Sequence, residues 1–154
     1  MEAINSAITE SGSGGVLPTF GAFMGFVELL LRVAVMAGPL LLLGFGLIFL
    51  LAPPKEANYG VGYRFWWGMA SLAAWKFTQR LAGMVWSALG AVLTIVMAFI
   101  CNGFRDLEAM DMASRAGTCV LWELCIIVAA CIAINITVMV RFDKDGFLRK
   151  ETEE

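Results

Sequence analysis

Histidine is absent from this 154-residue chain, and charged residues are scarce. The lack of histidine removes the most common metal ligand, general base and pH sensor of proteins. Charged side chains make up 16% of the residues and hydrophobic ones 60%. Soluble domains average about 25% charged and about 45–50% apolar residues, so this composition predicts an integral membrane protein.

The sequence also lacks the usual patterns of catalytic and metal sites. Its four cysteines form no Cys-x-x-Cys pair, no nucleophile is accompanied by a base, and no glycine-rich phosphate loop follows a strand. We therefore expect no enzyme activity, no metal and no cofactor. The basic residues are spread along the expected membrane surface, which does not favour direct binding of nucleic acid.

Three hydrophobic runs are long enough to cross a bilayer, whose hydrocarbon core takes about 20 apolar residues. They comprise residues 33–51, 81–100 and about 118–140. The chain becomes apolar at Phe20, so the first helix is expected to begin near there, and Pro53-Pro54 should end it. The sequence therefore predicts an all-α fold with three transmembrane helices.

The distribution of Lys and Arg predicts how these helices are oriented. Basic residues are few before the first run, numerous between the first and second, few again before the third, and numerous after it. Cytoplasmic segments collect Lys and Arg, so the N-terminus is expected outside and the C-terminus in the cytoplasm. A flexible extracellular tail at 1–19, a membrane domain at 20–148 and a polar cytoplasmic tail at 149–154 complete the expected organisation.

The loop Asn58–Gly83 holds three of the five tryptophans together with several basic residues. Treating Trp66–Arg80 as a helix places four apolar residues on one face: Trp66, Ala70, Ala73 and Phe77. Such a face suits the headgroup level of a bilayer, which predicts a cytoplasmic interfacial helix in contact with membrane lipids. Trp75 falls in the polar arc of that helix, so it must pack against the bundle or a partner.

Small residues recur at four-residue intervals in the second run, at Gly83, Ser87 and Ala91. A row of this kind lets another helix approach closely. We expect it to pack within the helix bundle.

Several ionisable or polar residues lie at membrane depth. Glu28 and Arg32 are four residues apart and can form an ion pair on one helix face. Arg32 lies at a comparable depth and is the expected partner of Glu123 in an ion pair that stabilises the bundle, although Glu28 competes for it. The alternatives for Glu123 are a polar site that opens outward or a side chain that reaches to the interface. Asn135 and Thr137 extend this polar character, so the third helix should turn one face to the bundle interior or to a partner.

The four cysteines have different expected environments. Cys101 and Cys119 lie at the outer ends of the second and third runs and could form a disulfide in an oxidising compartment. Cys125 and Cys131 are expected to be small core residues.

The loop resembles the signature of the SdpI immunity-protein family of bacterial membrane proteins, in which an Asn precedes Gly-Tyr-Arg, then Trp, a basic residue and Gly. The matching residues are Asn58, Gly62, Tyr63, Arg64, Trp75, Arg80 and Gly83. Lys144-Asp145-Gly146 also resembles the tails of family members. The chain departs from the family at Phe65-Trp66, where Thr-Pro is common, and at Leu72–Ala74, where acidic residues are common.

The resemblance implies immunity to a membrane-active peptide toxin, membrane sequestration of a cytoplasmic regulator, and residence in the bacterial cytoplasmic membrane. The signature would then be a cytoplasmic docking surface. A structural interpretation is equally open, in which Arg64 contacts lipid phosphate, Tyr63 sits in the aromatic belt and Gly62 permits a tight turn. The alternative function is a non-catalytic accessory subunit of a larger membrane complex, and a homo-oligomer is compatible with either function.

Overall fold

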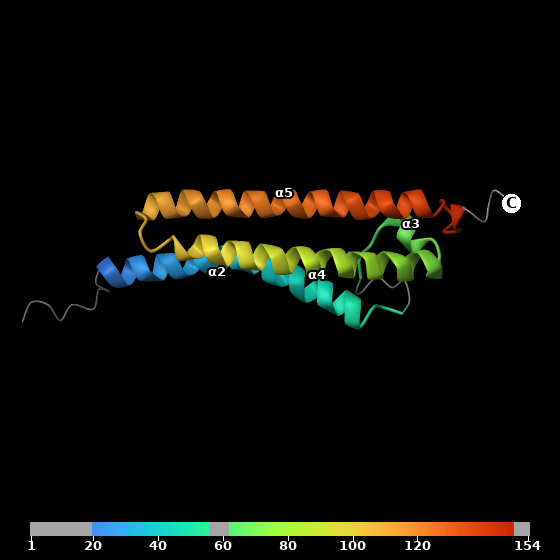
Figure 1. Ribbon diagram of the computed structural model, residues 1–154, viewed down its shortest axis with the longest axis horizontal. Coiled ribbons are helices and arrows are strands. Elements are labelled where there is room, and N and C mark those ends of the chain that lie inside the picture. The colour runs from blue at the N-terminus through green and yellow to red at the C-terminus, as the bar shows by residue number, and fades with distance from the viewer. Residues whose placement is uncertain (1–19, 56–61, 150–154) are drawn as a thin grey trace, which may run out of the picture.

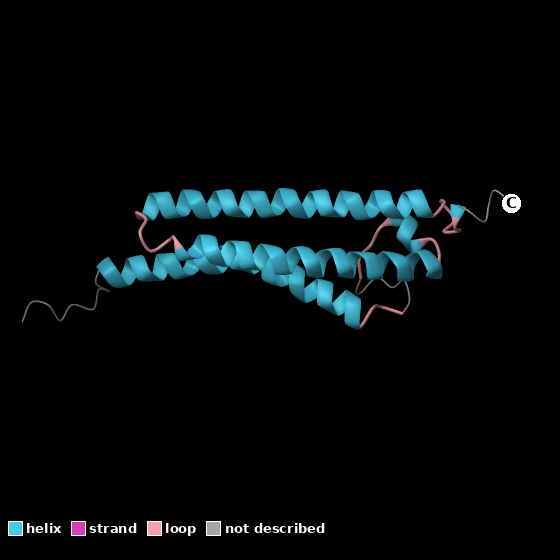
Figure 2. Ribbon diagram, viewed as in Figure 1, coloured by secondary structure: helices cyan, strands magenta, loops and turns pink. Residues whose placement is uncertain are grey.

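The computed structural model describes residues 20–55 and 62–149 of the chain. They form α2 (Phe20–Leu51), the single-turn α3 (Trp66–Met69), α4 (Leu72–Asn102) and α5 (Ala109–Arg141). Figure 2 shows a fold made of helices and loops, and within the two described ranges the only β-type pairing is an isolated bridge between Phe142 and Leu148. The predicted tail at 1–19, Asn58 and residues 150–154 lie outside the described part.

The three long helices lie lengthwise along the molecule, and each runs in the opposite sense to the one before it (Figure 1). Each is long and apolar enough to cross a membrane, so the three predicted long apolar helices are confirmed. Every helix is longer than the hydrophobic run from which it was predicted, because helical structure continues into the more polar turns at its ends. The helix α2 already runs from Phe20, the first described residue, to Leu51, and Pro53-Pro54 follow its end as expected.

The contact between α2 and α4 is close because glycines leave room for backbone against backbone. A side chain on Gly46 would collide with the backbone of Trp86 and Ser87. A Cβ on Gly83 would lie 2.8 Å from the backbone nitrogen of Leu50. The small-residue row of the second span therefore packs within the chain, against α2.

The predicted continuous helix over Trp66–Arg80 is wrong, because the chain breaks between α3 and α4. Ser71 has an extended backbone (φ −143°, ψ 161°), and its hydroxyl accepts a 3.0 Å hydrogen bond from the backbone nitrogen of Ala74. Serine is a favoured residue at this capping position because it satisfies an orphan N–H of the first turn. Residues 72–80 consequently form the first turns of the long α4, and only α3 remains of the separate helix.

The third long helix, α5, buries a narrow stripe and exposes most of its apolar side chains. Its buried positions follow one helix face: Met112, Ala116, Cys119, Glu123, Ile134 and Val138. Large apolar residues such as Leu121, Trp122 and Val140 are 64–69% exposed on the other faces. An apolar surface of this extent suits contact with lipid tails.

Candidate functional site

The segment that precedes α3 and contains Gly62, Tyr63 and Arg64, here called the signature loop, is held against α4 by the side chain of Gln79, which is fully buried. Its Oε1 accepts a hydrogen bond from the backbone nitrogen of Tyr63 (2.8 Å), and its Nε2 donates one to the backbone oxygen of the same residue (2.7 Å). The amide thus pairs with the loop backbone as a neighbouring strand would. Both polar backbone groups of Tyr63 are satisfied without secondary structure in the loop.

Trp75 connects the same loop to the segment that follows α2. Its ring is fully buried, and its Nε1 donates a 2.9 Å hydrogen bond to the backbone oxygen of Pro54. The ring also lies so close to Gly62 that a Cβ there would be 2.7 Å from it. Gly62 has φ +133°, a conformation that favours glycine, so both backbone and space require glycine at this position.

The Tyr63 side chain reaches across the bundle to α5. Its hydroxyl donates to Asn135 Oδ1 at 2.7 Å and lies 3.2 Å from the backbone oxygen of Cys131. Its ring packs edge-on against Trp86, with 5.4 Å between ring centroids. Burial, with an additional contribution from Cys131, raises the pKa of Tyr63 to about 12, so its hydroxyl remains a donor at neutral pH.

The C-terminal segment packs at the same end of the bundle. The Ser71 hydroxyl donates a 2.7 Å hydrogen bond to the backbone oxygen of Gly146. Gly146 has φ +80°, and a Cβ there would lie 2.7 Å from the Ser71 backbone nitrogen. Asp143 Oδ1 accepts hydrogen bonds from the backbone nitrogens of Asp145 (3.0 Å) and Phe147 (2.8 Å), which closes a turn over Lys144-Asp145-Gly146.

The signature residues therefore separate into two sets. Gly62, Tyr63, Trp75 and Gly83 point inward and join the loop to the three long helices. Arg64 and Arg80 are exposed. Asn58 lies outside the described residues.

Gln79 and Ser71 are central to this end of the bundle, but sequence reasoning did not single them out. Gln79 follows Trp75 by four residues, so both lie on one face of the helix. The sequence offered one indication that Gln79 is buried: it lies one helical turn after Trp75, a tryptophan that must itself be buried. The partner of Gln79 is a backbone segment 16 residues away, and no local pattern identifies it.

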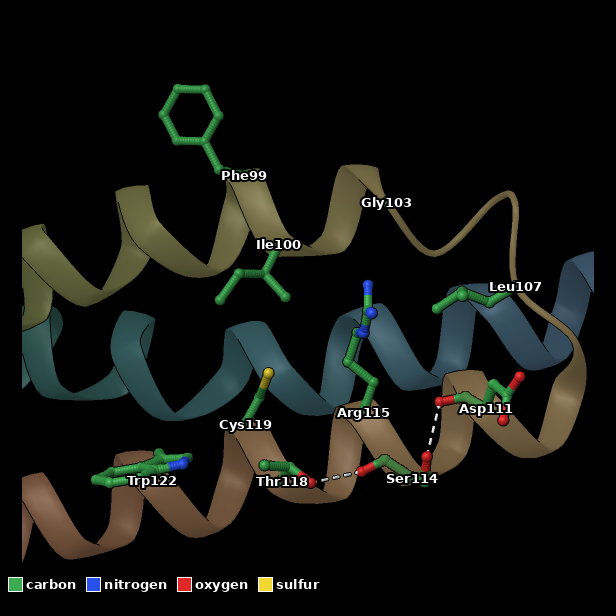
Figure 3. Close-up of a pocket in the computed structure, with 10 residues that line it drawn as sticks. All are labelled: Phe99, Ile100, Gly103, Leu107, Asp111, Ser114, Arg115, Thr118, Cys119 and Trp122. Atoms are coloured by element: carbon green, nitrogen blue, oxygen red, sulfur yellow. Dashed lines mark hydrogen bonds between the residues drawn. The ribbon is translucent and has the colours of Figure 1, made fainter.

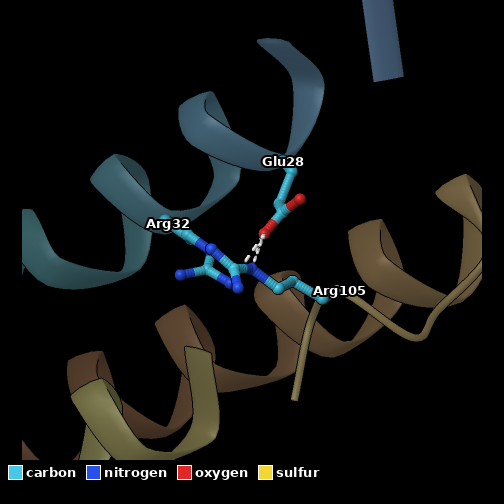
Figure 4. A network of polar contacts seen from close by, with 3 residues as sticks. All are labelled: Glu28, Arg32 and Arg105. Atoms are coloured by element: carbon cyan, nitrogen blue, oxygen red, sulfur yellow. Dashed lines mark ion pairs between the residues drawn. The ribbon is translucent and has the colours of Figure 1, made fainter. Parts of the chain in front are cut away.

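Arg32 pairs with Glu28 and not with Glu123, its expected partner, in the described part of the chain. Arg32 Nη2 lies 2.6 Å from Glu28 Oε1, and Arg105 Nε lies 3.9 Å from the same oxygen (Figure 4). Of the two carboxylates considered for Arg32, the structure therefore selects Glu28, which is one turn away on the same helix. This local contact requires no precise approach of two helices.

Glu123 is buried between α5 and α2, with 4% of its surface exposed. Its Oε1 has no hydrogen-bond partner within the described ranges, and its Oε2 fits against the backbone of Gly38, where a Cβ would be 2.7 Å away. Thr137 is exposed, and its hydroxyl donates a hydrogen bond to the backbone oxygen of Ala133 on the same helix. The inward polar positions of α5 are thus Glu123 and Asn135.

The cysteines are all free thiols. Cys101 and Cys119, for which a disulfide was considered, are both buried in one hydrophobic cluster between the helices. Cys125 is exposed and Cys131 is partly buried, so Cys125 is not the core residue expected from its sequence position.

A cleft of about 770 Å³ lies at the opposite end of the bundle, between the end of α4 and the start of α5 (Figure 3). Its lining combines apolar side chains with a cation and an acid, among them Ile100, Leu107, Asp111, Arg115 and Trp122. The Arg115 side chain extends toward α4 (Figure 3) and would come within 3.9 Å of a Cβ on Gly103. The cleft is therefore amphipathic.

Comparison of the sequence with known protein families finds one matching family. The sequence model of the SdpI/YfhL protein family matches residues 55–140, which include the signature loop, α4 and nearly all of α5. No curated protein and no solved structure matches the chain. The match covers more than half of the 154 residues.

Proposed function

The chain belongs to the SdpI/YfhL protein family, and we propose that it is an SdpI-like membrane protein that protects its cell against a membrane-active peptide toxin. The family match carries this proposal. It spans the same residues that the structure joins into one unit, from the signature loop through α4 to α5. The hydrogen bonds of Gln79 and Tyr63 give that unit a defined geometry.

We assign the protein to the bacterial cytoplasmic membrane, with the signature end in the cytoplasm. Four basic residues precede or begin α4 at this end, and four more follow the third span: Lys55, Arg64, Lys76, Arg80, Arg141, Lys144, Arg149 and Lys150. Cytoplasmic segments are enriched in Lys and Arg. This orientation places the amphipathic cleft between α4 and α5 on the outer side of the membrane.

The outer cleft is the surface that we propose to contact the toxin. A secreted membrane-active peptide arrives from outside and carries both apolar and polar groups. Trp122 and Leu107 offer apolar contact, whereas Arg115 and Asp111 offer charge (Figure 3). A volume of about 770 Å³ accommodates a few side chains, so the cleft would hold part of a peptide at the membrane surface.

The cytoplasmic end is the surface that we propose to bind a regulator. Its exposed signature residues are Arg64 and Arg80, and the turn over Lys144-Asp145-Gly146 packs against Ser71 at the start of α4. Family resemblance implies such a regulator. Exposed cations on the loop and on the first turns of α4 provide a pattern of charge that a protein partner can recognise.

The accessory-subunit alternative is less favoured by the contacts within the chain. The small residues that could have received a neighbouring subunit pack against α2, and Asn135 bonds to Tyr63. A larger complex or a homo-oligomer would have to use the exposed apolar faces of the helices. Lipid covers such faces equally well.

Toxin challenge tests the proposed immunity. Cells sensitive to the secreted peptide toxin of the founding family member, and lacking its immunity gene, should survive when they produce this protein. Arg115→Ala with Trp122→Ala should remove protection, whereas Trp66→Ala, an exposed tryptophan at the other end, should not. Full sensitivity of cells that contain the wild-type protein in their membrane would overturn protection against this toxin.

A further inference from the structure

A second hollow lies at the cytoplasmic end, beside the last turn of α2 and the first turns of α4. Its volume is about 450 Å³, and its lining residues are Phe49, Leu50, Pro53, Pro54, Lys55, Lys76 and Arg80. Four of these are apolar or proline residues, and the other three are cations. Among residues 20–55 and 62–149, no acidic residue contributes to the lining.

The three cations have no acidic partner in the described part of the chain. The ion pairs there join Glu28 with Arg32 and Arg105 at the opposite end of the bundle. Lys76 and Arg80 are four residues apart on α4, where like charges repel and destabilise the helix slightly. An anion placed between their side chains would turn this repulsion into attraction.

The position of the hollow relative to the spans identifies the kind of anion. Leu50 belongs to the last turn of α2, one of the three helices that can cross a membrane, and Pro53-Pro54 follow directly after it. Apolar lining thus lies on the membrane side, and the side chain of Lys55 follows at the level where headgroups begin. Leu50 is 37% exposed and can contact an acyl chain.

We propose that this hollow binds the phosphate headgroup of an anionic phospholipid in the leaflet on that side of the membrane. The phosphate lies among Lys55, Lys76 and Arg80, and the upper part of an acyl chain packs along Leu50. Each Lys or Arg near an anionic membrane surface contributes about 1 kcal/mol of attraction. Free inorganic phosphate shares the charge but lacks the acyl chain, so the apolar lining favours the lipid.

Retention of lipid by the purified full-length protein tests the site. The protein would be placed in nanodiscs of phosphatidylcholine with a minor fraction of phosphatidylglycerol, released into mild detergent, and examined by native mass spectrometry. Wild-type protein should keep phosphatidylglycerol in preference to phosphatidylcholine. The double variant K76Q/R80Q should lose at least about tenfold of that preference, because two attractive charges are removed.

The matched control is K144Q/R149Q, which removes two exposed cations at the same end but outside the hollow. It should retain phosphatidylglycerol as the wild type does. Equal losses in the two double variants would show that only diffuse positive charge attracts lipid, and would overturn the site. Displacement of phosphatidylglycerol by millimolar inorganic phosphate, with no effect of L50Q, would identify a free-phosphate site and overturn the lipid assignment.

Discussion

The side-chain amide of Gln79 forms two reciprocal hydrogen bonds with the backbone of Tyr63, of 2.8 and 2.7 Å. This relationship fixes a loop of irregular backbone to a helix that can cross the membrane. It also places the Tyr63 hydroxyl where it meets Asn135 on α5. A residue on α4 thereby couples the loop to α5, which also packs directly against α4 at this end, where Ala74 and Val138 share one buried cluster.

Gln79→Ala is expected to destabilise the protein by about 2–3 kcal/mol, because two hydrogen bonds are lost and two backbone groups of Tyr63 are left unpaired. Chemical or thermal unfolding in detergent, followed by tryptophan fluorescence, measures the change. Lys76→Ala, at an exposed position on the same helix, should stay within about 0.5 kcal/mol of wild type. Equal effects of the two variants would contradict the role of the Gln79 amide.

Gly46 and Gly44 offer a matched pair on α2. Gly46→Ala should destabilise by about 1–3 kcal/mol, since its Cβ would collide with the backbone of α4 at Trp86 and Ser87. A Cβ on Gly44 would have no neighbouring atom of the described residues within 4 Å. Gly44→Ala should therefore be neutral or slightly stabilising, because alanine favours the helix. Unfolding of both variants in the same detergent provides the comparison. A tolerated Gly46→Ala would mean that the two helices are farther apart.

The carboxylates of Glu28 and Glu123 should respond differently to neutralisation. Glu28→Gln is expected to cost about 1–2 kcal/mol, because Arg32, only 26% exposed, loses its charged partner. Glu123→Gln should be neutral or stabilising, since Glu123 Oε1 has no partner to lose and the buried side chain no longer carries a potential charge. The unfolding free energies of the two variants, measured in the same detergent as wild type, test both expectations. A larger loss for Glu123→Gln would show that Arg32 pairs across the bundle instead.

Tyr63 should make stability depend on pH in the alkaline range. Its pKa is raised to about 12 in the folded protein, against about 10 for an unperturbed tyrosine. The neutral phenol is favoured by folding, so its contribution is complete below about pH 10 and is lost as pH rises from about 10 toward 12. The Tyr63→Phe variant should lack this part of the pH dependence.

Spectroscopic titration checks the same pKa directly. The chain has two tyrosines, Tyr59 and Tyr63, so Tyr59→Phe leaves a single reporter. Tyrosinate absorbance should then rise with a midpoint near pH 12 in the folded protein and near 10 after denaturation. A midpoint near 10 in both states would place the hydroxyl of Tyr63 in water.

Sequence alone determined the three helices, because their hydrophobic runs are far longer than a soluble core requires and their ends carry clear stop signals. It also identified the signature loop and the close approach allowed by Gly83, which follow from local spacing. The spacing of Glu28 and Arg32 allowed their ion pair, but depth along the helices favoured Glu123 as the partner of Arg32, and that expectation was wrong. The expected helix over Trp66–Arg80 failed because helical periodicity does not show a capping serine that starts a new helix at Leu72.

Only the tertiary structure decided which way the signature residues face. Trp75 is buried because the chain after α2 returns to supply the Pro54 oxygen, and Tyr63 points inward because Asn135 lies across from it. These partners are distant in sequence, and their meeting depends on how the three helices pack. The hollow formed by Lys55, Lys76 and Arg80 has the same origin, since its walls come from two helices that glycines bring into contact.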